Sequence, residues 1–150
     1  MPSLKKLAIL PEGTMAVRDA RGDIVTDETT GAEWSITVHS PGTKEFQKAK
    51  HTFDAKRSDS TLALMSGKGD TKREAEEEQK HVAEFLASVT KSFNGFDYEG
   101  RHGYEAYKAA YLDLEIAHVA SDLNKYLGNR GNFLPPKATP SSNTFGTQPG

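Results

Sequence analysis

Alternating hydrophobic and polar residues mark the N-terminal part of the chain. Trp34, Ile36 and Val38 alternate with polar residues, which is the period of two that a half-buried strand requires. Shorter apolar runs lie at 7–10, 15–18 and 24–26, separated by residues typical of turns. We therefore expect residues 4–40 to be rich in β structure, with the last two of these runs forming a hairpin.

A helical pattern begins after residue 40. Ser40 and Pro41 favour a helix start, with Thr43 as a rival cap. We expect this helix to end near Arg57, because residues 58–70 contain many small residues and glycines, as loops do. One side of the helix carries Phe46, Ala49 and Phe53.

A second helix is predicted from Asp70 or Thr71 through Phe93. Acidic residues crowd its first turns, where the helix dipole favours negative charge. Asn94 and Gly95 tolerate the left-handed conformation of a C-cap. The hydrophobic residues of this segment recur at the spacing of one helix face: Val82, Phe85, Leu86, Val89 and Phe93.

A third helical region, 104–127, ends at Gly128 and has two apolar stripes. One consists of Leu112, Ile116, Val119, Leu123 and Tyr126. The other consists of Tyr104, Tyr107, Tyr111, Leu114 and His118. Either the domain buries this region on two sides, or the helix breaks near Asp113, or one stripe meets another protein. The tyrosine-rich stripe is the better interface candidate, because tyrosine is enriched at interfaces.

The C-terminal residues differ in composition from the rest. Residues 132–150 are rich in Pro, Ser and Thr and hold one charged residue, Lys137, so we expect a flexible tail with Phe133 and Phe145 as possible anchors. Residues 1–131 are predicted to form a single α+β domain. In it, a small N-terminal β hairpin or sheet packs on a body of about three helices over 41–128.

Composition and residue spacing exclude or disfavour several classes of function. The chain has 150 residues, no cysteine and a formal charge of −2, which excludes disulfides and cysteine catalysis and disfavours polyanion binding. We expect no membrane span and no export signal, because no apolar run approaches the necessary length. The five histidines lack the spacing of a helical metal site. No nucleophile and base can be named from spacing, so we expect no enzyme, no metal and no cofactor.

The remaining candidate features are charged and glycine-rich segments that we expect on the surface of the protein. Basic residues cluster between Lys44 and Arg73; a solvated face explains them better than a nucleic-acid site, because few aromatic residues lie among them to stack on bases. The glycines around Lys68 lack the spacing of a phosphate-binding loop. The sequence therefore favours an interaction protein.

Three segments resemble a known family. They are the junction Trp34-Ser-Ile-Thr-Val-His-Ser-Pro-Gly-Thr-Lys-Glu-Phe46, the acidic turn Thr26-Asp-Glu-Thr-Thr-Gly31 and the closing Tyr126-Leu-Gly-Asn-Arg-Gly-Asn-Phe133. Together they are similar to tail assembly chaperones and related small tail proteins of long-tailed bacteriophages, over roughly residues 24–133.

The resemblance implies a non-enzymatic role in the host cell cytoplasm. Such chaperones form oligomers and bind the helical tape measure protein, keeping it soluble until tail tube subunits polymerise around it. Candidate oligomer or client residues are Tyr104, Tyr107, Tyr111, Leu114 and His118, with Phe46 and Phe53 as a second choice. The main alternative is a virion subunit, namely a tail terminator or a head–tail connector; a nucleic-acid-binding regulator is a more remote one.

Overall fold

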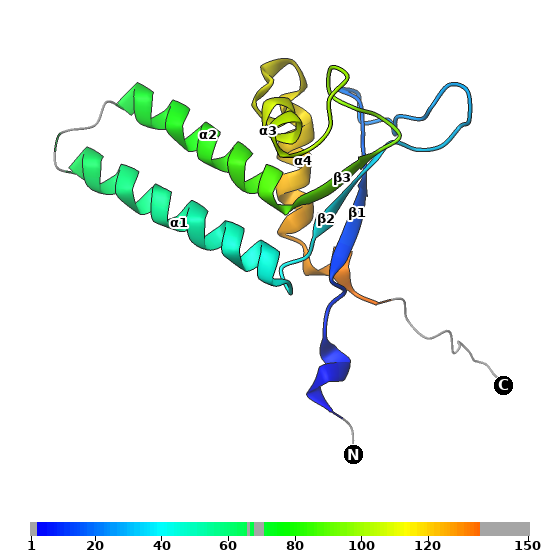
Figure 1. The fold of residues 1–150 in the computed structure, drawn as a ribbon, viewed down its shortest axis with the longest axis horizontal. Helices are drawn as coiled ribbons and strands as arrows, with labels where there is room; N and C mark the ends of the chain where they lie inside the picture. Colours follow the sequence, from blue (N-terminus) through cyan, green and yellow to red (C-terminus); the bar gives the residue numbers. More distant parts are fainter. Residues whose placement is uncertain (1–2, 66, 68–70, 136–150) are drawn as a thin grey trace.

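Three antiparallel strands, in the order β1-β2-β3, form one sheet that is covered on one face by helices (Figure 1). The computed structural model describes residues 3–65, 67 and 71–135. Its elements confirm the predicted α+β class. They are η1 (Leu4–Leu7), β1 (Glu12–Ala16), β2 (Ser35–His39), α1 (Lys44–Met65), α2 (Thr71–Val89), β3 (Thr90–Asn94), α3 (Tyr104–Leu112), η2 (Leu114–Ile116), α4 (Ala117–Leu127) and η3 (Arg130–Phe133).

The central strand β2 shows the alternation that its sequence predicts. Ile36 and Val38 are completely buried, and Ile36 pairs with Met15 on one side and Phe93 on the other. The opposite face of the sheet is polar. There the Thr14 and Thr37 hydroxyls lie 3.1 Å apart, so that this face needs no cover.

The predicted hairpin after β1 is also present. Arg18 and Ile24 form an antiparallel bridge, and the Asp19 carboxylate accepts hydrogen bonds from the backbone N–H groups of Arg21 and Asp23 at 2.9 and 3.1 Å. By contrast, the apolar run at 7–10 is not a strand. Leu4–Leu7 forms a short 3-10 helix with no buried residue, because no neighbouring strand lies beside it.

Helices α1 and α2 form a long hairpin that projects from the rest of the molecule (Figure 1). The Thr43 hydroxyl, the rival cap, accepts the Phe46 N–H at 3.2 Å. Helix α1 continues to Met65, so the predicted end near Arg57 and the loop over 58–65 are wrong. Residues 58–65 contain neither Gly nor Pro, and nothing in them stops a helix that packs on α2.

The second helix ends earlier than predicted, at Val89. Residues 90–94 form strand β3, so Asn94 and Gly95 are not a helix C-cap. Phe93 fits the helical stripe by spacing, but it reaches the core from the strand, opposite Ile36. Pairing with the free edge of β2 supplies backbone hydrogen bonds that a longer helix would forgo.

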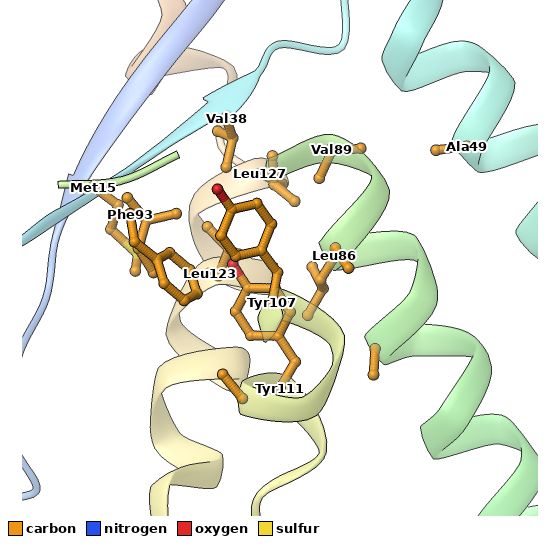
Figure 2. Close-up of a cluster of buried hydrophobic side chains, with 14 of the residues drawn as sticks. Met15, Val38, Ala49, Leu86, Val89, Phe93, Tyr107, Tyr111, Leu123 and Leu127 are labelled. Atoms are coloured by element: carbon orange, nitrogen blue, oxygen red, sulfur yellow. The ribbon is translucent and has the colours of Figure 1, made fainter. Parts of the chain in front are cut away.

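Aromatic and aliphatic side chains from the sheet, α2, α3 and α4 meet in one core (Figure 2). The Phe93 ring centre lies 4.4 Å from that of Tyr107 and 6.1 Å from that of Tyr111. The third helical region breaks at Asp113, whose backbone is extended and whose carboxylate caps η2 at Glu115. The break is one of the alternatives that the sequence leaves open.

The chain beyond α4 remains packed for longer than predicted. Phe133 lies in η3 and is fully buried, with its ring edge-on to Tyr126 at 5.4 Å. Its carbonyl accepts the Leu10 N–H at 2.7 Å. The expected tail therefore cannot begin at residue 132, because Phe133 anchors this segment to the core. Asp70 lies outside the described residues, and so do residues 136–150, which include Phe145.

Candidate protein-interaction surface

A groove of about 390 Å³ runs between α1 and α2 and ends at the first residue of α3. Helix α1 contributes Ala49, Thr52, Phe53 and Lys56, and α2 contributes His81, Glu84, Phe85 and Ser88. Both sets have the spacing i, i+3, i+4, i+7, which places their members on one helix face. Because these two faces oppose each other, we call this feature the α1–α2 groove.

The floor of the α1–α2 groove is aromatic. The Phe85 ring centre lies 5.4 Å from that of Phe46, edge-on, and 5.7 Å from that of Phe53. Phe46 is buried beneath the floor, whereas Phe53 is half-buried and lines the groove. Tyr104 stands at the end with 41% of its surface exposed. The groove thus offers apolar surface that no described residue covers.

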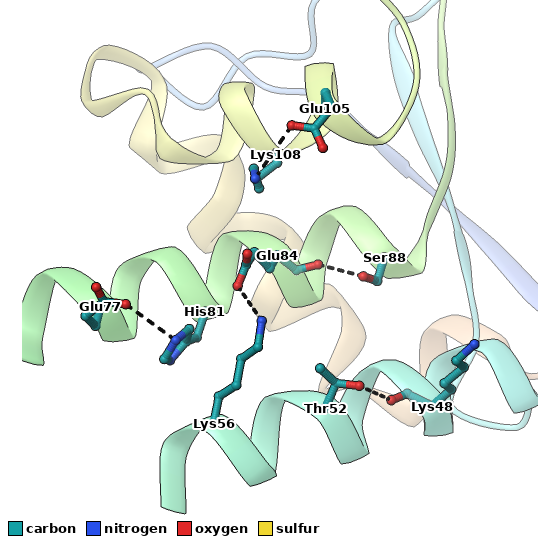
Figure 3. Close-up of polar contacts among 9 residues, drawn as sticks. All are labelled: Lys48, Thr52, Lys56, Glu77, His81, Glu84, Ser88, Glu105 and Lys108. Atoms are coloured by element: carbon teal, nitrogen blue, oxygen red, sulfur yellow. Dashed lines mark hydrogen bonds and ion pairs between the residues drawn. The ribbon is translucent and has the colours of Figure 1, made fainter. Parts of the chain in front are cut away.

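Charged groups border this floor (Figure 3). The Lys56 ammonium lies 3.0 Å from the Glu84 carboxylate, and His81 Nε2 lies 3.6 Å from Glu77. Burial alone would raise the pKa of Glu84, but the hydrogen bond and charge of Lys56 outweigh it and lower that pKa. Glu84 is therefore ionised at neutral pH and the ion pair is intact.

Lys108 of α3 helps to hold Tyr104 in place. Its ammonium lies 5.8 Å from the centre of the Tyr104 ring. The same ammonium lies 3.6 Å from the Glu105 carboxylate (Figure 3). A cation near an aromatic ring is attracted to the negative face of the ring. Lys108 therefore favours a position of the Tyr104 ring at the end of the groove.

The structure divides the predicted interface residues among several places. Tyr104 and Phe53 lie together at the α1–α2 groove. Tyr107 and Tyr111, at 8% and 7% exposure, belong to the core, where the Tyr111 hydroxyl lies 2.7 Å from that of Thr90. Burial raises the pKa of Tyr111, so its hydroxyl stays protonated.

The other two predicted residues lie beyond the helix break. Leu114 is 79% exposed in η2, and His118 Nε2 lies 3.0 Å from the Arg18 carbonyl oxygen. The five residues of the tyrosine-rich stripe therefore do not form one surface, because the extended Asp113 interrupts the helical phase.

Two groove features were not predicted, namely Phe85 as its floor and the Lys56–Glu84 ion pair. The predicted hydrophobic stripe of the second helix includes Phe85. No feature of the neighbouring sequence, however, indicated that α1 packs against Phe85. The available signal was charge: α1 is rich in lysine and α2 in glutamate, and the pairs Lys56–Glu84 and Arg57–Glu78 join the two helices.

The groove can hold a few apolar side chains between charged borders. Over the described ranges, no three His, Asp or Glu side chains converge as metal ligands. Among the helices of those ranges, none has the length and apolar character needed to cross a bilayer.

The fold and the groove define an α+β domain with a partly apolar groove on a projecting helical hairpin. Comparison of the chain with protein-family models, with curated proteins and with solved structures gave no match.

Proposed function

We propose that this protein is a non-enzymatic phage tail assembly chaperone that self-associates, binds the tape measure protein and keeps it soluble in the host cell cytoplasm. The observation that carries the proposal is the α1–α2 groove, with its aromatic floor and charged border. It adds to the sequence resemblance of residues 24–133 to such chaperones.

The groove suits a helical client. An amphipathic helix binds by laying apolar residues of one face into a groove, while its polar residues meet the rim. Phe53, Phe85 and Tyr104 supply the apolar contacts. Lys56 and Glu84 pair with each other beside these rings, so the rim is polar and suits the polar residues of an amphipathic helix.

The size of the groove also favours several copies acting together. About 390 Å³ accommodates only a few side chains, whereas a tape measure protein presents a long helix. Repeated grooves on linked copies gain affinity because each further contact is intramolecular. Self-association and client binding are therefore parts of one mechanism.

The test is co-expression with a candidate tape measure protein, followed by size-exclusion chromatography with light scattering. We expect a soluble co-complex with the natural chain. Tyr104→Ser should weaken it about tenfold or more, as loss of an interface aromatic does. Leu114→Ser is the matched control, since Leu114 is exposed but lies outside the α1–α2 groove.

Equal loss in both variants, or in neither, contradicts the groove as the client site. Mass spectrometry of purified virions distinguishes the chaperone from the alternative, a subunit that stays in the virion. A stoichiometric subunit in finished particles would favour the tail terminator or head–tail connector, whereas its absence supports a chaperone that leaves after assembly.

A further inference from the structure

An N-terminal arm, residues 3–8, leaves the body beside η3 and points away from it (Figure 1). Its leucines are almost fully exposed, Leu4 at 84% and Leu7 at 76%. The turn is nevertheless organised, because the Ser3 hydroxyl accepts the Lys5 N–H at 3.2 Å. Two exposed leucines on an ordered turn suit a partner surface better than solvent.

A second cavity, of about 290 Å³, shares no lining residue with the α1–α2 groove. We call it the tryptophan cavity. The hairpin after β1, the loop after β3, α3 and α4 enclose it. Its walls are mainly apolar and include Trp34, Phe93, Phe96, Tyr111, Ile116 and Val119.

Stacked aromatic rings form one wall of the tryptophan cavity. Phe96 stacks between Trp34 and Phe93, with ring centres 5.0 and 4.7 Å away. Trp34 Nε1 is buried and has no hydrogen-bond partner among the described residues. A preformed apolar hollow with aromatic walls is typical of a binding site.

The arm cannot enter the cavity of its own chain. The Leu10 N–H is fixed to the Phe133 carbonyl, and β1 leads from there to the hairpin at the far end of the sheet (Figure 1). The extended chain from Leu10 to Arg18 covers roughly 25 Å. From Leu10 back to Leu7 the chain reaches only about 10 Å.

The arm and the cavity are complementary in size and charge. An apolar cavity of about 150 Å³ accepts a benzene-sized group, so about 290 Å³ accommodates two leucine side chains. Lys5 and Lys6 lie between the two leucines of the arm. The border of the cavity carries Asp19 and Asp97, which accept backbone N–H groups and so are held in place.

Two basic groups also line this border. The Arg18 guanidinium donates to the Gly22 carbonyl at 2.8 Å, and the His118 ring is engaged by the Arg18 carbonyl oxygen. The border therefore carries both signs of charge, and its two carboxylates keep acceptor sites beyond those filled by backbone N–H groups, which suit Lys5 and Lys6 of another copy.

We propose that the N-terminal arm of one copy docks Leu4 and Leu7 into the tryptophan cavity of a second copy. The contact joins two different surfaces, so copies associate head to tail and form a ring where the rotation closes, or an open chain where it does not. The inference rests on the self-association within the proposed function and names the surfaces responsible for it.

The test uses two full-length variants, each defective in one partner of the contact. Leu4→Ser with Leu7→Ser removes the docking groups but keeps the cavity. Ala20→Arg puts a bulky cation at the exposed border of the cavity but keeps the arm. By light scattering, the natural chain should reach at least twice its 16.4 kDa mass, and each variant alone should remain at 16.4 kDa.

An equimolar mixture of the two variants should form a heterodimer and stop there, because only one functional arm and one functional cavity are present. A mixture that stays monomeric overturns the arm-to-cavity contact, as does a variant that assembles like the natural chain. If the natural chain itself is monomeric, the proposed self-association is wrong. Client binding is tested separately, by the co-expression experiment with Tyr104→Ser.

A second readout remains valid if Ala20→Arg fails to fold. Trp34 is the one tryptophan of the chain, so its emission reports on the cavity directly. A synthetic peptide of residues 3–10, titrated into the Leu4→Ser, Leu7→Ser protein, should shift that emission to shorter wavelength and saturate. The same peptide with serine at both leucines should have no effect; equal responses, or none to either, contradict the docking.

Discussion

Replacing Phe133 by alanine tests the packing of the C-terminal segment on the sheet. The Phe133 side chain is fully buried and lies edge-on to Tyr126. The ring also lies so close to Gly13 that a Cβ there would be 2.7 Å from it. Alanine at 133 therefore removes a ring that β1, α4 and η3 share, and leaves a cavity between them.

The size of the effect follows from this burial. A Phe→Ala change in a core costs about 3–5 kcal/mol, depending on how far the site collapses. Phe133 is completely enclosed, so we expect the upper half of that range. A domain of this size is stable by about 5–15 kcal/mol, and each kcal/mol corresponds to roughly 3–4 °C. The Tm should fall by about 12–20 °C.

Thermal unfolding followed by circular dichroism measures this shift. Leu134→Ala is the matched control, because Leu134 is the next residue and is 54% exposed. It should lower the Tm by no more than about 2 °C. Deletion of residues 134–150 should likewise have little effect, since it leaves Phe133 in place. A Phe133→Ala variant that melts within about 3 °C of the natural chain would refute the packing.

Changing Tyr107 and Tyr111 together to serine should lower the Tm, followed by circular dichroism, by about 18 °C or more, because two core aromatics are lost at about 3–5 kcal/mol each; a Tm within about 3 °C of that of the natural chain would place them outside the core. Gly13→Ala should cost about 1–3 kcal/mol in urea denaturation through overpacking, whereas unchanged stability would contradict the close contact. Lys56→Met should cost under about 1 kcal/mol at pH 7. That difference should vanish as the pH falls through the lowered pKa of Glu84, below its ordinary 4.5; a difference persisting in acid counts against the ion pair.

Local patterns were sufficient for several elements. The alternation through Ile36 and Val38 predicted β2, and the turn residues before Ile24 predicted the hairpin. Each of these signals lies within a few residues of the structure that it predicts. The break at Asp113 was one of the alternatives, because two apolar stripes on one helix are more than a single buried face requires.

Other features depend on contacts between distant residues. Phe93 satisfies both a helical stripe and a strand, and only its pairing with Ile36 decides between them. In the same way, the spacing of Tyr107 and Tyr111 shows that they share one helix face, but it does not show which residue packs on that face. In the structure this residue is Phe93 of β3. The α1–α2 groove forms only when the two helices pack together. Which residues of α1 face which residues of α2 could therefore not be derived from local sequence.

Amide hydrogen exchange of the co-complex with a candidate tape measure protein tests the central claim most directly. The proposal predicts slower exchange, relative to the free protein, in the groove-lining parts of α1 and α2 and in the first turn of α3. The polar outer face around Thr14 and Thr37 should exchange as before. Protection of that outer face, with the α1–α2 groove unchanged, would contradict the account.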